Sequence, residues 1–327
     1  MLETWLALAG GLLLLISGGD LLVRGAVQAA GRLGVSPLVI GLTLVGFGTS
    51  TPELVTSVQA ALVDAPGIAY GNIVGSNIAN VLLILGASAV LCPIAVESAA
   101  LRRDGLVTVT VAAIFAALAA TTSMGRPSGA VFLLLLAAYV YIAFRQERQA
   151  GADQHGAVFD KSLALQSADP GTVPTPRGRG PILGPLLIAM GGLLLVMLGG
   201  SLLVDGAISV ARSFGISETV IGLTIVAAGT SLPEFVTSVL AAMRRQVDVA
   251  FGNVIGSNIY NILGIGGATA LIAPGKVPAE IVSFDNVVMI GVSVLLVAFA
   301  WTGHKITRWE GAALLAGYLT YIFVLWP

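Results

Sequence analysis

The chain has 327 residues, of which 56% are hydrophobic and only 10% are charged. A soluble domain is about 25% charged, so these proportions exclude an ordinary water-soluble globule. The formal net charge of −1 gives no overall field that attracts nucleic acid, and a single cysteine excludes an internal disulfide.

Apolar runs of about 20 residues recur along the chain, which predicts an all-α membrane protein with ten transmembrane helices. The first run begins near the N-terminus, where MLETWLALAGGLLLL lacks the basic start of a cleavable signal. The predicted ranges, in chain order, are roughly 3–31, 36–63, 67–91, 104–122, 127–146, 181–212, 217–243, 248–272, 284–302 and 306–326.

Residues 147–180 are the one long polar segment, and their composition is typical of a flexible linker with little core of its own. This segment divides the chain into a first five-helix repeat (1–146) and a second (181–327). Asp104 opens the fourth predicted helix, where an N-cap or helix-dipole role is favoured.

Lysine and arginine predict the orientation, because cytoplasmic loops carry an excess of both. When the connections are assigned alternately to the two sides, thirteen basic residues fall on one side, and only Arg126, Arg212 and Lys276 fall on the other. We therefore expect an integral, multi-pass protein of the plasma (inner) membrane, with a cytoplasmic linker and both termini outside.

The two halves align when the sequence is shifted by 181 residues. GTSTPELVTSV (48–58) then meets GTSLPEFVTSV (229–239), and GNIVGSNIANVL (71–82) meets GNVIGSNIYNIL (252–263). An odd number of spans in each repeat makes the two copies cross the membrane in opposite directions. This plan of two inverted repeats is typical of secondary transporters, whose site lies at mid-membrane between the repeats.

Each copy of the first motif predicts an interrupted helix that carries a carboxylate. Pro52 has no N–H for the carbonyl of Gly48, and Pro233 has none for that of Gly229. Backbone groups freed at membrane depth need a protein partner or a cation. The GSN triplets of the second motif predict a further break in each half.

The two motifs together supply hard oxygen donors on shared helix faces, because the polar positions lie three or four residues apart. Candidate cation ligands are Glu53, Glu234, Thr49, Thr230, Ser50, Ser231, Ser76, Ser257, Asn80 and Asn261. Such oxygens suit Ca²⁺ and Na⁺. Two glutamates match the charge of one Ca²⁺ or two Na⁺, and competition for one site couples the two fluxes.

The doubled motifs resemble the α-repeats of the sodium/calcium exchanger (calcium/cation antiporter) superfamily, and the resemblance to its bacterial members covers nearly the whole chain. It implies that Glu53 and Glu234 are the central ligands of calcium and sodium. It also implies oxygens from Thr49 and Thr230, flanking sodium positions lined by Ser50, Ser76, Ser231 and Ser257, and central amides from Asn80 and Asn261. The first and sixth helices are then expected to slide together and alternate access.

The implied function is Na⁺/Ca²⁺ antiport for calcium extrusion, with Ca²⁺ and Na⁺ as substrates and with no cofactor. Some exchangers carry an aspartate where this chain has Asn261, which leaves Ca²⁺/H⁺ or K⁺-dependent antiport open. An ion channel is a further alternative, although the inverted repeats argue against it.

A membrane enzyme is disfavoured, since the sequence lacks H-E-x-x-H and G-x-S-x-G motifs and offers no catalytic residue. Structural interpretations also remain open: hydroxyls often bond the preceding helical turn, and asparagines bond across helices. The oligomeric state is open, a monomer included.

Overall fold

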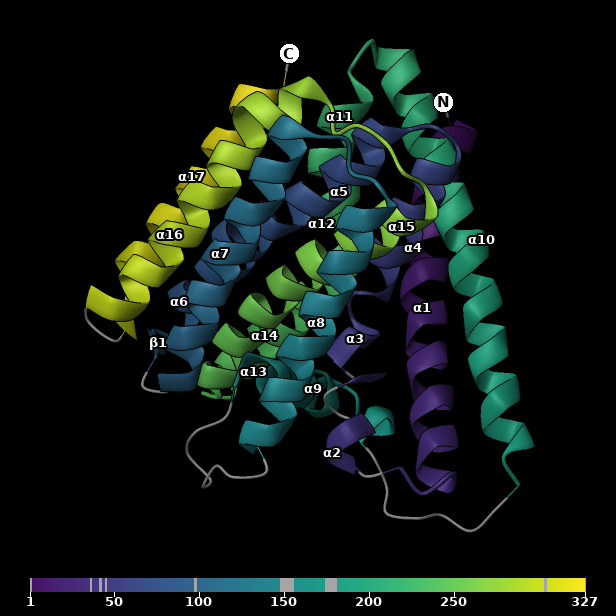
Figure 1. The fold of residues 1–327 in the computed structure, drawn as a ribbon, viewed down its shortest axis with the longest axis vertical. Helices are drawn as coiled ribbons and strands as arrows, with labels where there is room; N and C mark the ends of the chain where they lie inside the picture. Colours follow the sequence, from purple (N-terminus) through teal and green to yellow (C-terminus); the bar gives the residue numbers. More distant parts are fainter. Residues whose placement is uncertain are drawn as a thin grey trace.

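The computed structural model describes residues 2–35, 37–40, 43–44, 46–96, 99–147, 156–173, 181–302 and 305–326. Helices form most of the described chain (Figure 1). In the first half the elements are α1 (Leu2–Arg32), α2 (Pro37–Ile40), α3 (Gly46–Gly48), α4 (Thr51–Leu62), α5 (Pro66–Ala79), the π-helix η2 (Asn80–Leu85), α6 (Gly86–Leu91), β1 (Ile94–Ala95), α7 (Ala99–Thr121) and α8 (Arg126–Glu147).

The segment between the halves contains α9 (Ala157–Ala168) and the 3-10 helix η3 (Pro170–Thr172). The second half contains α10 (Leu183–Phe214), α11 (Glu218–Ile221), the π-helix η4 (Gly222–Val226), α12 (Ala227–Thr230), α13 (Leu232–Met243), α14 (Val247–Ile259), the π-helix η5 (Tyr260–Gly266), α15 (Gly267–Ile272), the π-helix η6 (Ile281–Asp285), α16 (Asn286–Thr302), β2 (Lys305–Ile306) and α17 (Arg308–Leu325). The short strands β1 and β2 pair antiparallel and join the two halves.

Seven helices in the described chain are long and apolar enough to cross a membrane. The count rises to eight if 218–230 and 232–243, which meet at an angle of 49°, form one broken span. The chain is therefore a multi-pass membrane protein. The predicted total of ten spans and the inverted relation of the two repeats stay predictions.

Helices α1 and α10 lie side by side along one edge of the molecule (Figure 1). Gly11 faces the backbone of Leu203, and Gly18, one heptad later, faces that of Val196. The opposite sequence directions show that the pair is antiparallel. Small residues allow this close approach, which is a main source of helix association in lipid, where the hydrophobic effect between helices is weak.

The core of the molecule forms around α5 and α14, the two most buried candidate spans. The predicted break at GSN is wrong, because α5 continues through Gly75 and widens into a π-helix only at Asn80. A Cβ at Gly75 would lie 2.5 Å from the carbonyl oxygen of Leu223. The glycine therefore permits close packing against η4 instead of ending the helix.

The expectation of a flexible linker is wrong for residues 157–168, which form the packed helix α9. Ala157, Val158 and Ala164 bury apolar surface on one side of α9, and Lys161 is fully buried beside them. This helix packs chiefly on α14 and also on α13. The segment therefore carries a buried face that its polar composition concealed.

The expected N-cap role of Asp104 is also wrong, because α7 begins at Ala99 and Asp104 lies inside the helix. Its carboxylate instead accepts hydrogen bonds from the Arg103 side chain and from the backbone N–H of Ala157. Asp104 therefore binds the first residue of α9, a segment far away in the sequence.

Candidate functional site

The two GTSxPE motifs interrupt their helices where the prolines predict it. In the first half, Thr49 and Ser50 form a turn between α3 and α4, and Pro52 lies at the start of α4. In the second half, Ser231 separates α12 from α13. Glu53 and Glu234 consequently fall in the first turns of α4 and α13, where unpaired N–H groups and the helix dipole favour a negative charge.

Each glutamate accepts a hydrogen bond from the serine of the opposite half. Ser50 donates to Oε1 of Glu234 at 3.1 Å, and Ser231 donates to Oε1 of Glu53 at 3.0 Å. Glu53 and Glu234 are each 1% exposed. Two segments 181 residues apart in the sequence therefore meet at one buried centre that contains both acids.

Two further asparagines hold this centre in place. Asn72 donates to the backbone oxygen of Glu53 and to Ser57, and its own Oδ1 accepts from Thr230 of the other half. Asn253 likewise donates to the backbone oxygen of Glu234. These asparagines therefore hold the backbone of the acidic turns.

Several buried oxygens of the predicted site have no hydrogen-bond partner in the described chain. They are Oε2 of Glu53, Oε2 of Glu234, Oγ of Ser76, and Oδ1 of Asn80 and of Asn261. A buried polar atom without a partner is costly, and a buried carboxylate oxygen is especially so. A bound cation coordinated by such oxygens removes this cost.

The predicted residues are placed unequally around the centre. Ser50, Ser231, Glu53 and Glu234 are joined directly by hydrogen bonds. Thr230 instead donates to Asn72 and to its own helix, and Asn80 donates to Asn258 of the other half. Ser76 is fully buried and Asn261 is 1% exposed, and no hydrogen bond ties their side chains to the carboxylates.

Lys161 of α9 enters the same centre, and the sequence analysis missed its role because a lysine in a polar linker was counted only as an orientation signal. Its Nζ lies 2.8 Å from Oγ1 of Thr49, 3.3 Å from Oγ of Ser50 and 3.5 Å from Oε1 of Glu234. It also donates to Ser257. Burial lowers the pKa of the Lys161 ammonium, while the nearby Glu234 and Glu53 carboxylates act to raise it.

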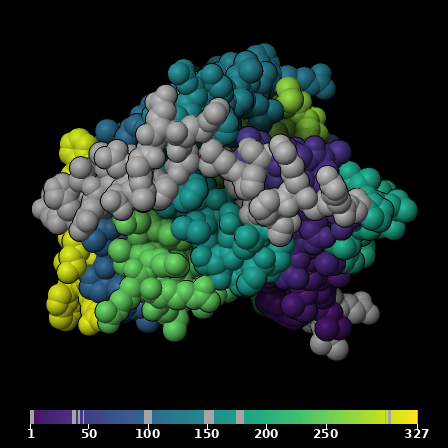
Figure 2. Space-filling view, turned by 90° about the horizontal axis from the view of Figure 1, so that it is seen from below, coloured from purple at the N-terminus to yellow at the C-terminus, as the bar shows by residue number. Residues whose placement is uncertain are grey.

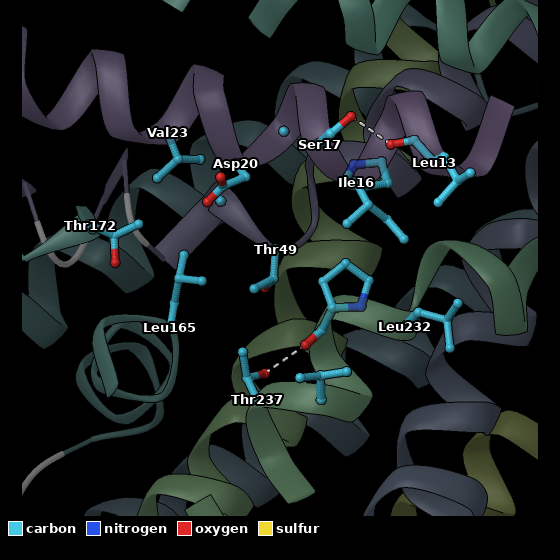
Figure 3. Close-up of a pocket in the computed structure, with 15 residues that line it drawn as sticks. Leu13, Ile16, Ser17, Asp20, Val23, Thr49, Leu165, Thr172, Leu232 and Thr237 are labelled. Carbon is cyan, nitrogen blue, oxygen red and sulfur yellow. Dashed lines mark hydrogen bonds between the residues drawn. The ribbon is translucent and has the colours of Figure 1, made fainter. Parts of the chain in front are cut away.

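A cavity of about 530 Å³ lies between α1 and the acidic turns and touches Thr49, Pro52 and Pro233. Its wall includes Asp20 of α1, Thr49, Leu165 of α9 and Thr237 of α13 (Figure 3). Figure 3 shows Leu165 and Thr49 on the side facing Asp20 and Val23 of α1. The space beside the acidic turns is therefore bounded by α1, by the two interrupted helices and by α9.

Comparison with known proteins agrees with this arrangement. A family model described as sodium/calcium exchanger protein matches residues 3–145 and 184–326. The sodium/calcium exchanger MaX1 of Methanosarcina acetivorans is 37% identical over 342 residues, covering 98% of each chain. The inner membrane protein YrbG of Escherichia coli is 33% identical over 319 residues, covering 97% of this chain and 94% of its own.

A solved structure of the sodium-calcium exchanger NCX_Mj, soaked with 10 mM Na⁺ and no Ca²⁺, has a similar fold. The superposition gives a TM-score of 0.63 at 33% identity and covers 99% of both chains. A second NCX_Mj structure, soaked with neither Na⁺ nor Ca²⁺, gives 0.60 at 36% identity and covers 99% of both.

Proposed function

Because the chain belongs to the sodium/calcium exchanger family, a family of cation antiporters of the membrane, we propose that it exchanges Na⁺ for Ca²⁺ and thereby extrudes calcium. The observation that carries this proposal is the reciprocal pair of bonds from Ser50 to Glu234 and from Ser231 to Glu53. These bonds gather two negative charges at one buried centre. The charge of such a centre is matched by one Ca²⁺ or by two Na⁺.

The central cation ligands in this proposal are buried oxygens that lack a hydrogen-bond partner in the described chain. Oε2 of Glu53 and Oε2 of Glu234 bind the ion directly, and the amide oxygens of Asn80 and Asn261 complete the ring. Hydroxyl or carbonyl oxygens on either side of this ring come from Ser76, Ser257, Thr49, Ser50, Thr230 and Ser231. All are hard donors of the kind that Ca²⁺ and Na⁺ prefer.

Alternating access is assigned to the α1–α10 pair. The two helices pack closely on each other through small residues, and a cavity lies between α1 and the acidic turns. Sliding of the pair past α4 and α13 opens this space to one face of the membrane or the other. We assign the face that carries α9 to the cytoplasm, in line with the distribution of lysine and arginine.

The test is calcium-45 uptake into proteoliposomes loaded with Na⁺ and diluted into Na⁺-free medium. We expect uptake that depends on the outward Na⁺ gradient and stops when a Na⁺ ionophore dissipates that gradient. Glu280→Gln, a change at an exposed acid outside the site, is the matched control and keeps wild-type uptake. Calcium uptake that ignores the Na⁺ gradient but follows a pH gradient contradicts Na⁺ coupling and favours Ca²⁺/H⁺ exchange. A requirement for K⁺ favours K⁺-dependent exchange.

A further inference from the structure

We propose that Lys161 is a tethered cation, which competes with the transported ions for one side of the exchange site. The inference rests on the proposed function, since it treats the buried oxygens around Glu53 and Glu234 as a cation site. Lys161 belongs to α9, which lies outside the helices that qualify as membrane spans. Its side chain is nevertheless 0% exposed.

The ammonium group has the surroundings of a bound cation. Its contacts are the hydroxyls of Thr49, Ser50 and Ser257 and the carboxylate of Glu234. All four residues are predicted ion ligands, and they come from both halves of the chain. A buried ammonium requires compensation by oxygens and by negative charge, and this pocket supplies both. Na⁺ or Ca²⁺ bound to the same oxygens would have to displace the lysine.

The Lys161 ammonium occupies only one of two pockets that are related by the sequence repeat. The residues equivalent to the lysine pocket under the 181-residue shift are Thr230, Ser231, Ser76 and Glu53. In that counterpart Oγ of Ser76 has no hydrogen-bond partner in the described chain, whereas the equivalent Ser257 accepts from Lys161; Oε2 is unpaired in Glu53 and Glu234 alike. The lysine therefore fills one of two related pockets and leaves oxygens of the other unpaired.

The lysine also alters a bond that the two halves are expected to share. Thr230 of the second half donates to Oδ1 of Asn72 of the first at 2.9 Å. At the equivalent position Oδ1 of Asn253 has no partner in the described chain, and Thr49 contacts Lys161 instead. The protein thus lacks one of the two related hydrogen bonds where the ammonium binds.

Helix α9 is held over the site at both ends. The backbone N–H of Ala157 donates to Asp104 of α7 at 2.8 Å. At the other end, Arg24 of α1 bonds Asp169 at 2.8 Å, and Arg244 donates to the backbone oxygen of Ser167. Figure 2 shows this segment in teal at the centre of the face viewed from below, between the green of α13 and α14 and the purple of α1.

The Arg24–Asp169 ion pair links α9, which carries Lys161, to α1, the helix that is proposed to slide. Sliding of α1 would strain or break this anchor, and the loss of the anchor favours withdrawal of α9 and Lys161. Because only undocked molecules bind a transported cation at this position, the apparent affinity equals the intrinsic affinity multiplied by the undocked fraction. If Lys161 is docked in about 90% of molecules, apparent cation binding is therefore about tenfold weaker.

The test is equilibrium binding of calcium-45 to the purified full chain in Na⁺-free buffer, which requires no transport. Lys161→Met keeps an apolar stem of similar length and removes the charge, and we expect its dissociation constant for Ca²⁺ to fall about tenfold. Asp169→Asn weakens the anchor at a distance from the ion oxygens, and we expect a smaller fall in the same direction. Lys305→Met, at an exposed lysine of β2, is the matched control and keeps the wild-type constant.

An unchanged or larger dissociation constant in Lys161→Met overturns the inference and leaves the exchange function intact. If Lys161→Met does not yield a monodisperse protein, Asp169→Asn decides by the same criterion. If neither the wild type nor any variant binds Ca²⁺, the proposed function itself fails. Tighter binding in both variants, with no change in Lys305→Met, supports the tethered cation.

Discussion

Gly18→Ala tests whether close contact between α1 and α10 holds the proposed sliding pair together. A Cβ at Gly18 would lie 2.7 Å from the backbone nitrogen of Val196, whereas ordinary contacts begin at 3.4 Å. The helices must therefore separate by about 0.7 Å (3.4 − 2.7), and overpacking of this kind costs about 1–3 kcal/mol. Gly10→Ala is the matched control, because a Cβ there meets nothing within 4 Å.

Both substitutions gain the same helix propensity from alanine, so their difference isolates the contact. The assay is thermal unfolding of the purified proteins in detergent, followed by Na⁺-driven calcium uptake after reconstitution. We expect Gly18→Ala to melt several degrees below Gly10→Ala, since each kcal/mol shifts the midpoint by about 2–4 °C in a large domain. Uptake should fall with it. Equal melting and equal uptake of the two variants would refute the close-packed pair.

Two other substitutions probe the exchange centre. Ser231→Ala removes the hydroxyl that donates to Glu53. Because a hydrogen bond to a charged group contributes about 1.5–3 kcal/mol, calcium-45 binding should weaken about tenfold or more. Wild-type affinity would show that this bond does not organise the site. Asn261→Asp adds a third acid at a buried amide that has no hydrogen-bond partner in the described chain. Calcium uptake should then gain a dependence on pH or a changed ion preference. An unaltered pH profile and unaltered selectivity would place Asn261 away from the ions.

Local chemistry in the sequence accounts for much of the centre. Pro52 and Pro233 predict the helix breaks because a missing N–H acts within one helical turn, and both breaks are present. The repeat under the 181-residue shift predicts that Glu53 and Glu234 have the same role. The repeat also predicts that the two glutamates meet, because equivalent segments of inverted repeats meet in secondary transporters, and both lie at one buried centre. The inversion itself stays a prediction.

The parts that sequence reasoning missed depend on contacts between distant segments. AVFDKSLALQSA, residues 157–168, has a weak amphipathic pattern and no side-chain N-cap, so little in it predicts a docked helix. Its first N–H donates to Asp104, and its lysine contacts hydroxyls of both halves and the carboxylate of Glu234. The apolar residues Val158, Leu163 and Leu165 within the polar linker are the one signal that could have indicated a buried face.

Gly75 of the second motif also has a role that depends on a contact with a distant segment. A glycine before Ser-Asn fits either a helix break or a close helix contact, and the sequence cannot decide between them. The backbone of Leu223, which makes the close contact, lies 148 residues away (223 − 75) in the sequence. The π-helix that begins at Asn80 is also largely buried in the core.

The most direct test of the shared carboxylate centre is the number of Ca²⁺ ions bound by the wild type, Glu53→Gln and Glu234→Gln, measured by equilibrium dialysis with calcium-45. Loss of one unit charge about 4 Å from a divalent ion removes about 8 kcal/mol of attraction at an effective dielectric constant of about 20, twice the value for two unit charges, and lowers affinity by more than a thousandfold. We expect one ion bound by the wild type and none by either folded variant at the same concentration. Retention of wild-type calcium binding by either variant would contradict a single site that needs both acids.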